Sequence, residues 1–158
     1  MILRRYRAED RVGCQQVFYD AVRQGAATFY TAEQRAAWAP TPDPDPNLPD
    51  KLLQQACFVA VQDDRIVGLM SLAEGGYLDM AFVRPEVMGK GVATALHGAV
   101  LDEARAQGKT RLTTHASHLA RRFFGRNGWQ VDFEEDVALR GQVLHRFGMS
   151  LSLDCPGA

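Results

Sequence analysis

The stretch from Met88 to Thr94, read Met88-Gly89-Lys90-Gly91-Val92-Ala93-Thr94, holds the residues whose types and spacing point most directly to chemistry. It lies between a strand-like segment that Pro85 ends and an amphipathic helical pattern that starts at Val92. Backbone N–H groups at the start of a helix have no partner inside it, and the helix dipole favours an anion there. Glycines let phosphate oxygens approach the main chain closely, and the lysine and threonine add donors. The stretch predicts a phosphate-binding turn.

Two better-known phosphate-binding patterns do not fit this stretch. The lysine-serine or lysine-threonine pair of a P-loop is missing, and so is the complete G-x-G-x-x-G order with a ribose-binding acid downstream. Taken alone, therefore, the stretch leaves an ordinary tight turn open as an alternative.

The composition is that of a globular protein: 158 residues, of which 46% are hydrophobic and 23% charged. A formal net charge of −1 gives no reason to expect binding to nucleic acid or to an anionic membrane. The charged segment 1–7 has no apolar run behind it, and no stretch approaches the ~20 apolar residues of a membrane span. We expect a cytoplasmic protein. Its cysteines, Cys14, Cys57 and Cys155, form no CxxC pair, which predicts buried thiols and neither a disulfide framework nor a metal site.

Hydrophobic periodicity and turn residues predict an α+β fold, in which helices pack on one mixed sheet. The expected strands are 2–6, 57–62, 65–74, 77–83, 110–116, 129–139 and 143–153. The expected helices are 9–24, 31–38, 92–107 and 117–127, with a short one at about 50–56. Asp63-Asp64 and Gly141 are the expected hairpin turns.

Five prolines in segment 40–49 prevent regular structure there. The segment has the composition of a domain linker, but the 39 residues before it are too few for an independent core. We therefore expect a surface loop inside one domain, residues 1–153, followed by a C-terminal tail, 154–158.

From Tyr77 onward the chain resembles the GCN5-related N-acetyltransferases (GNAT), whose coenzyme A loop reads Q/R-x-x-G-x-G/A. Segment 82–96 follows that run, with Met88 at the Q/R position and with Gly91 and Ala93 matching. A second block, Ser117-x-x-Ala120-x-x-Phe123-Phe124-x-x-x-Gly128-Trp129, resembles the family's N-x-x-A-x-x-F-Y-x-x-x-G-F. Together the two blocks identify the chain as similar to this family over about half its length.

The resemblance implies a mostly antiparallel, V-splayed sheet of six to seven strands, with helices on both faces and the acyl-thioester between the fourth and fifth strands. It also implies acetyl-CoA as co-substrate. The residues expected to bind it are Ala81, Phe82, Val83, Met88, Gly89, Lys90, Gly91, Val92, Ala93, Thr94, Ser117 and Phe124. Three of these depart from the family's pattern: Met88 lacks the polar side chain, Ser117 replaces an asparagine, and Phe124 replaces a tyrosine often proposed to protonate the thiolate.

The implied reaction is direct attack of a neutral amine on the thioester in a ternary complex, with backbone N–H groups of Ala81, Phe82 and Val83 polarising the carbonyl. Asp79 is the first candidate for the base that removes the amine's proton. The other candidate catalytic residues are Glu74, His115 and Tyr30. The acid missing at Phe124 is expected to be replaced by water, Tyr77 or Tyr30. Each candidate residue has a plain structural role as its alternative, and the H-x-x-H pair formed with His118 has no third ligand, so no metal is expected.

Three functions follow from these residues. The first is an N-acetyltransferase for a primary amine of a small molecule or peptide, whose acceptor lies against Phe29, Tyr30 and Trp38. The second is a non-catalytic acyl-CoA sensor, which the departures at Met88 and Phe124 favour. The third, an acetyltransferase acting on charged tRNA, is disfavoured by the net charge of −1. A homodimer is an expectation by analogy with the family.

Overall fold

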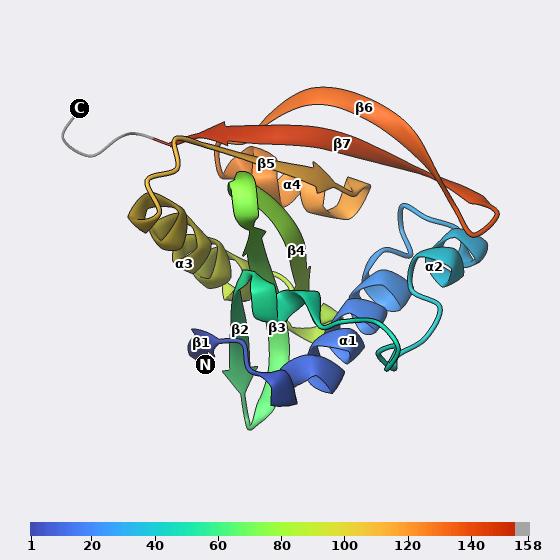
Figure 1. The fold of residues 1–158 in the computed structure, drawn as a ribbon. Coiled ribbons are helices and arrows are strands. Elements are labelled where there is room, and N and C mark those ends of the chain that lie inside the picture. The colour runs from blue at the N-terminus through green and yellow to red at the C-terminus, as the bar shows by residue number, and fades with distance from the viewer. Residues whose placement is uncertain (154–158) are drawn as a thin grey trace.

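The chain is built around one seven-stranded mixed sheet in the order β1-β2-β3-β4-β5-β7-β6 (Figure 1). The computed structural model describes residues 1–153. The strands are β1 Ile2–Arg5, β2 Ala56–Gln62, β3 Arg65–Ala73, β4 Tyr77–Val83, β5 Arg111–Ala116, β6 Gln130–Leu139 and β7 Gln142–Ser152. The main helices are α1 Arg11–Asp20, α2 Ala32–Trp38, α3 Val92–Ala106 and α4 His118–Arg126. The predicted α+β class is confirmed.

Short helical turns connect these elements. They are η1 Ala8–Asp10, η2 Ala21–Gly25, η3 Lys51–Gln54, η4 Glu74–Gly76 and η5 Pro85–Val87. The helix expected over 9–24 is present, but its second part, η2, is wound as a π-helix. Where a short helix was expected at about 50–56, the chain forms one 3₁₀ turn, η3.

Tight turns set the register of the two long hairpins. Asp63 and Asp64 both have positive φ, 53° and 58°, which is the backbone of a two-residue hairpin turn. Arg140 and Gly141 repeat that arrangement between β6 and β7, with φ of 46° and 80°. Both predicted hairpins are confirmed.

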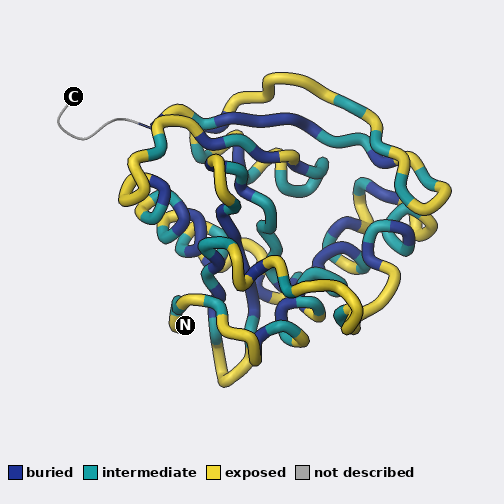
Figure 2. Tube along the Cα trace, in the orientation of Figure 1, coloured by how far each residue is buried: buried dark blue, intermediate teal, exposed yellow. Residues whose placement is uncertain are grey.

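Apolar clusters cover both faces of the sheet (Figure 2). On one face, Leu96 and Val100 of α3 pack with Leu72 of β3. On the other, Val17 of α1 packs with Val59 and Leu69. The implied placement of helices on both faces is therefore confirmed, and β6 is the strand left largely exposed.

The strands β4 and β5 are parallel and pair at two positions, Tyr77 with Thr113 and Leu78 with Thr114. Beyond Leu78 the two strands separate, and β5, β7 and β6 lean away from β2, β3 and β4 (Figure 1). The far end of the β6–β7 hairpin rests on α2, where Arg140 Nη1 donates to the Ala37 carbonyl at 2.6 Å. The V-splayed sheet implied by the family resemblance is thus present.

A β-bulge at Asp79 changes which face β4 presents. The register runs from Leu72–Leu78 to Ser71–Met80, so Asp79 has no partner in β3. Leu78 and Ala81 consequently both pack toward α3, although they are three positions apart. Asp79 and Met80, which are adjacent, line the same cavity on the opposite side.

The proline segment 40–49 contains neither helix nor strand and follows α1 on the surface. Arg11 Nη2 donates to the carbonyls of Asp45 and Leu48 at 3.1 and 2.8 Å, and Gln15 donates to that of Thr41 at 3.2 Å. These side chains satisfy backbone carbonyls that a proline-rich segment cannot pair internally.

The thiols of Cys14 and Cys57 are free and buried, as predicted. Burial raises the pKa of the Cys57 thiol to about 12, so it is uncharged at neutral pH. Cys155 and the expected tail 154–158 lie outside the described residues. Across residues 1–153, none of the helices combines the length and the apolar character needed to cross a membrane.

Candidate active site

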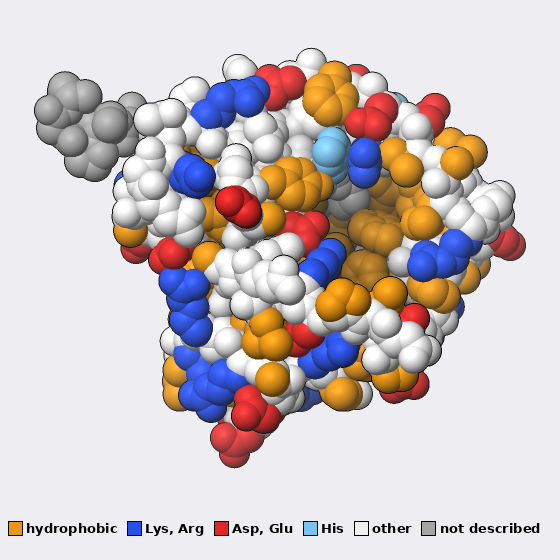
Figure 3. Space-filling view, viewed as in Figure 1, with side chains coloured by type: hydrophobic (Ala, Val, Ile, Leu, Met, Phe, Trp, Pro, Cys, Tyr) orange, Lys and Arg blue, Asp and Glu red, His pale blue; other side chains and the backbone are white. Residues whose placement is uncertain are grey.

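Two cavities meet at the splay between β4 and β5. The first, of about 300 Å³, lies beside the glycine-rich loop and is called here the loop cavity. The second, of about 410 Å³, lies toward α1, α2 and β7 and is called the aromatic cavity. Trp38, Phe82 and Ser117 line both. The hollow in the centre of Figure 3 has a hydrophobic floor with charged side chains around it.

The glycine-rich loop takes the backbone that its glycines predict. Gly89 and Gly91 have φ of 76° and 85°, values that L side chains rarely adopt. The Ala95 N–H donates to the Gly91 carbonyl at 3.0 Å, which is the first hydrogen bond of α3. The amides at the start of the helix, before Ala95, therefore have no acceptor within it. This turn supplies the free N–H groups that an anion requires.

The predicted cofactor-binding residues separate into three groups. Those that line the loop cavity are Ala81, Phe82, Val83, Met88, Gly89, Ala93, Ser117 and Phe124. Those that lie exposed around the start of α3 are Lys90, Gly91 and Thr94. Val92 is in the core beneath α3, so it has only its backbone to offer a ligand.

Met88, at the position where the family has a polar residue, is 42% exposed and lines the loop cavity with an apolar side chain. Cationic groups reach the same cavity from α4, where Arg122 and Arg126 both line it. They are four residues apart and therefore on one side of the helix. The sequence interpretation missed these two arginines, although this spacing was a signal that could have found them.

Ser117 and Phe124 place different chemistry at the splay. The Ser117 hydroxyl accepts the Ala120 N–H at 3.1 Å and so caps α4, while its own proton stays free to be donated. Phe124 is 1% exposed and packs edge-on against Trp129, with ring centroids 5.0 Å apart. Its ring fills the wall of the cavity and has no proton to donate.

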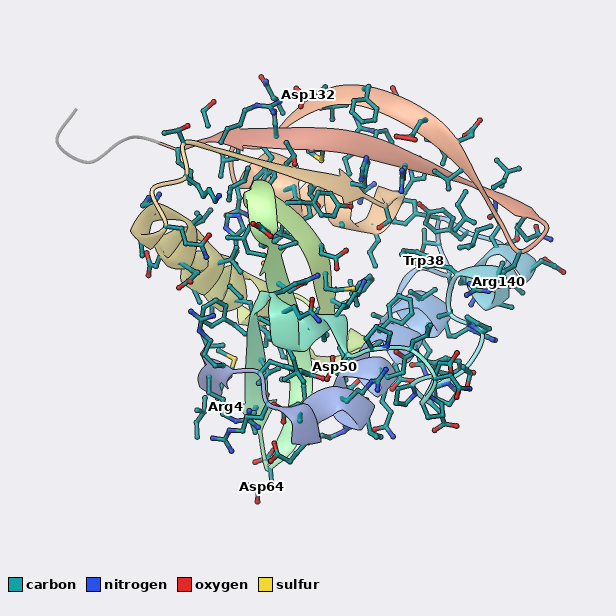
Figure 4. The ribbon with its side chains drawn as sticks, viewed as in Figure 1. Arg4, Trp38, Asp50, Asp64, Asp132 and Arg140 are labelled. Carbon is teal, nitrogen blue, oxygen red and sulfur yellow. The ribbon has the colours of Figure 1, made fainter. Side chains whose placement is uncertain are left out.

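Aromatic rings form one end of the aromatic cavity. The Trp38 ring lies 5.5 Å from Tyr30, 6.1 Å from Phe82 and 6.4 Å from Phe18, in edge-to-face contacts. Trp38 lies in the space between α1 and the β6–β7 hairpin (Figure 4). The aliphatic side chains at this end are Val137, Leu139 and Leu144.

The other end of the aromatic cavity is polar. Asp79 Oδ2 accepts from Gln55 Nε2 at 2.9 Å and lies 3.0 Å from Lys51 Nζ. The Tyr77 hydroxyl lies 2.9 Å from His115 Nδ1. His115 Nε2 is 3.7 Å from Glu135, which also meets the guanidinium of Arg146 at 3.3 Å.

The surroundings favour the neutral forms of Tyr77 and His115. Burial raises the pKa of Tyr77, and the negative charge of Asp79 acts in the same direction. Burial lowers the pKa of His115, with the positive charge of Arg146 acting in the same direction and Glu135 opposing. At neutral pH the imidazole is therefore uncharged, and its Nδ1 can accept the Tyr77 hydroxyl proton.

Tyr30 holds two elements together through its hydroxyl. The oxygen accepts the His118 N–H and its proton is donated to the His145 carbonyl, each at 3.0 Å. The side chain is 6% exposed, and burial raises the pKa of Tyr30. Its ring lines the aromatic cavity, but its hydroxyl joins the start of α4 to β7.

The four predicted catalytic residues do not all converge. Asp79 and His115 line the polar end of the aromatic cavity, and Tyr30 lines its wall. Glu74 is exposed in the turn before β4 and lines neither cavity. The sequence interpretation also missed Lys51 and Arg146, which segments far apart in the chain bring to the polar end.

His115 and His118, the H-x-x-H pair, have different partners. His118 stacks on His145, with ring centroids 5.5 Å apart, whereas His115 bonds to Tyr77. In the part of the chain that the structure describes, no group of three or more His, Cys, Asp or Glu side chains is arranged to hold a metal ion.

Comparison with known proteins identifies the class to which this fold and these cavities belong. A family model described as an acetyltransferase (GNAT) domain matches residues 19–151. The chain is also 32% identical over 147 residues, 93% of each chain, to the Escherichia coli (strain K12) protein named "Uncharacterized N-acetyltransferase YafP". The chain therefore belongs to the GCN5-related N-acetyltransferase family.

Solved structures agree with this assignment. A GCN5-related N-acetyltransferase from Rhodopseudomonas palustris superimposes with a TM-score of 0.90 at 32% identity, over 96% of this chain and 95% of that one. The PaiA N-acetyltransferase of Thermoplasma acidophilum, solved in complex with coenzyme A, has a TM-score of 0.77 at 16% identity, over 96% and 98% of the two chains. At that identity the second likeness shows the fold alone.

Proposed function

We propose that the protein transfers the acetyl group of acetyl-CoA to a primary amine by direct attack in a ternary complex. The observation that carries the proposal is the meeting of the two cavities at Phe82 and Ser117. One cavity has the glycine-rich turn with its free amides at its rim, and the other has a carboxylate and a histidine at its polar end. A molecule bound in each would bring its reacting end to the shared wall, where proximity supplies much of the rate.

The loop cavity fits the cofactor in three respects. The free amides that precede Ala95, at the positive end of the α3 dipole, suit a pyrophosphate. Arg122 and Arg126 would add positive charge there, in place of the polar side chain that Met88 lacks. The small side chains of Ala81 and Ala93 leave room for a narrow acyl-thioester arm.

The splay itself supplies donors for the thioester carbonyl. Beyond Leu78, β4 has β3 on one side and no strand partner on the β5 side. Amides of segment 81–83 that face the gap are therefore free to stabilise the negative charge that develops on the carbonyl oxygen. This is the role that the sequence interpretation gives to Ala81, Phe82 and Val83.

Asp79 and the Tyr77–His115 pair have different roles toward the amine: the first attracts it and the second takes its proton. The Asp79 carboxylate attracts the incoming ammonium, which loses one proton to water before the neutral amine reacts. As the nitrogen attacks the carbonyl carbon and the carbon–sulfur bond breaks, its second excess proton passes to the Tyr77 oxygen while the Tyr77 proton moves to His115 Nδ1. The sulfur leaves as a thiolate, which a thiol pKa of ~8.5 makes tolerable without an acid at Phe124.

Two measurements test the proposal. Acetyl-CoA should raise the melting temperature by binding the native state, and no shift at millimolar concentrations would contradict the cofactor assignment. Thiol release across a panel of primary amines then tests catalysis. Binding without thiol release from any amine would favour the alternative that Phe124 suggests, a non-catalytic acyl-CoA sensor.

A further inference from the structure

The aromatic cavity has two chemically different ends, and their arrangement restricts the acceptor. Phe18 and Trp38 form the apolar end together with leucines of the β6–β7 hairpin. Lys51, Asp79 and Arg146 form the polar end. In Figure 3 the same hollow shows hydrophobic side chains on its floor and both signs of charge at its edge. A ligand that fills the cavity needs an apolar body and a charged head.

The fixed charges that line this cavity have partners of opposite sign. Lys51 and Arg146 are cations, whereas Asp79 is the carboxylate among the lining residues. His145 also lines the cavity, but each of its ring nitrogens lies 2.8 Å from a carboxylate oxygen, one of Asp136 and one of Glu134. Its charge is thus offset. Glu135 likewise meets the Arg146 guanidinium at 3.3 Å, and Lys51 lies 3.0 Å from Asp79, so the charges at the polar end already have partners. A simple alkylamine would add an unbalanced positive charge there, whereas a zwitterion would add no net charge.

Two polar groups beside the polar end have unused hydrogen-bonding capacity. In the part of the chain that is described, Arg146 Nε is enclosed without an acceptor, and Gln55 Oε1 is enclosed without a donor. The guanidinium meets Glu135 through Nη2 alone, at 3.3 Å. The amide of Gln55 is held beside Asp79 through Nε2. Both atoms are closed to solvent, so a ligand meets the guanidinium through its other N–H groups, and meets Asp79 directly.

The missing partners have opposite chemistry. A guanidinium with free N–H groups suits a carboxylate, which it can bind through two parallel hydrogen bonds. The Asp79 carboxylate, which lines the cavity, suits an ammonium. Arg146 and Asp79 line the cavity together with Tyr77. A ligand that carries ammonium and carboxylate groups on neighbouring atoms would serve both.

We propose that the acceptor is a free amino acid with an aromatic or branched apolar side chain. Its carboxylate pairs with Arg146, its amino group lies at Asp79 and Tyr77, and its side chain packs against Trp38 and Phe18. The inference rests on the proposed function, because it names the substrate class of the same site. The cavity of about 410 Å³ has the size of a small-molecule site and not of a groove for a long peptide.

Three amines separate the contributions of the two ends. Phenylalanine and phenethylamine differ in the carboxylate, whereas phenylalanine and alanine differ in the ring. Thiol release with acetyl-CoA should show kcat/KM for phenylalanine at least about tenfold above that for either of the others. Equal or better turnover of phenethylamine, or of a polyamine, would overturn the amino-acid assignment while leaving the acetyltransferase proposal intact.

Substitutions at Arg146 test the carboxylate contact. Arg146→Gln should lower kcat/KM for phenylalanine about tenfold and change that for phenethylamine less than about threefold, a difference that a merely structural role would not produce. Arg146→Lys, which keeps the charge without the planar fork, should be intermediate. Arg111→Gln is the matched control, since Arg111 lines neither cavity. Equal losses for the two amines would contradict the contact.

Binding to the coenzyme A-loaded protein distinguishes this inference from the proposed function. Calorimetry should show tighter binding of phenylalanine than of phenethylamine or alanine, and Arg146→Gln should remove that preference. Selective binding without thiol release would refute catalysis and support the amino-acid site. Thiol release from other amines, with no selective binding of phenylalanine, would support catalysis and refute the site.

Discussion

The hydroxyl of Tyr77 lies 2.9 Å from Nδ1 of His115, and this contact joins β4 to β5 just where the two strands begin to separate. Tyr77 still pairs with Thr113, whereas the backbone of β4 has left β5 by Asp79. On the other side of the imidazole, His115 Nε2 lies 3.7 Å from a carboxylate oxygen of Glu135. A proton taken up by Tyr77 therefore has a route toward the outer strand β6.

Tyr77→Phe should lower kcat about 10- to 100-fold without changing the affinity for coenzyme A, because the hydroxyl that receives the amine proton is lost. The pKa of His115 is lowered by burial, so the imidazole becomes protonated, and stops accepting, only below about pH 6.5. The pH dependence of kcat/KM should therefore have an acid limb in that range, which His115→Gln should remove. An acid limb that persists in His115→Gln would exclude this histidine from the proton route.

Asp79→Asn should raise KM for the amine about tenfold, because the charge that attracts the ammonium is lost while its contacts with Lys51 and Gln55 are only rearranged. Affinity for coenzyme A should stay unchanged. Steady-state kinetics of Glu74→Gln supply the control, since Glu74 lines neither cavity. A larger effect from Glu74→Gln than from Asp79→Asn would reverse the roles proposed for the two carboxylates.

Tyr30→Phe should lower the free energy of unfolding by about 1–3 kcal/mol, because the half-buried N–H of His118 and the carbonyl of His145 both lose a partner. Turnover per folded molecule should stay within about threefold of wild type if the hydroxyl holds structure and transfers no proton. Chemical denaturation and kcat together check this. Tyr19→Phe is the control, since no hydrogen bond of the Tyr19 hydroxyl is found among the described residues. A large fall in kcat at unchanged stability would return Tyr30 to the catalytic set.

Gly91→Asp should abolish binding of acetyl-CoA, because it places a negative charge at the anion site on a backbone with φ of 85°. Gly98→Asp adds the same charge to the same helix, where an added Cβ meets nothing within 4 Å, and should leave affinity unchanged. Calorimetric titration compares the two. Retained affinity in Gly91→Asp would place the cofactor elsewhere.

Asp10→Asn should reduce the free energy of unfolding at neutral pH by about 1–3 kcal/mol. Asp10 is 5% exposed and makes two hydrogen bonds with the Arg4 guanidinium, at 2.7 and 2.9 Å, which lower the pKa of its carboxyl. Because the folded pKa is depressed, this stability is present above the unfolded value of ~3.9 and is lost as pH falls through the folded value.

Denaturation curves measured between about pH 2 and 7 check this sign. The wild-type advantage over Asp10→Asn should shrink at the acid end. The control is Asp102→Asn, whose carboxylate is 85% exposed and should contribute less than about 0.5 kcal/mol. A constant difference across the range would show that the carboxylate acts through shape and not through charge.

The elements were predictable from sequence where local chemistry decides them. Tyr77–Val83 forms a strand with the predicted bounds because Pro85 and the Gly75-Gly76 turn restrict it at both ends. The helix over His118–Arg126 starts at the Ser117 cap, as expected. The π-helical winding of η2 was not predictable, because its apolar spacing matches that of an α-helix equally well.

The site was predictable in part, for a related reason. The glycine loop is contiguous in the chain, so its backbone could be inferred from Gly89 and Gly91. The bulge at Asp79 depends on the register with β3, which no local pattern reveals. Lys51 and Arg146 reach the polar end only because distant segments meet there.

The splay has one more consequence, which concerns the lifetime of the protein. Two register pairs between β4 and β5, with the contacts of the hairpin on α2, join the halves of the sheet. Few backbone hydrogen bonds resist their separation, so most of the resistance comes from the apolar core that Leu78 shares with Leu112 and Phe147. Opening of that core is a route by which a protease can reach the chain. A ligand that touches both walls closes that route. We therefore expect the protein saturated with acetyl-CoA to be digested more slowly than the ligand-free protein. Supply of the acyl donor would then set both how fast the protein works and how long it lasts.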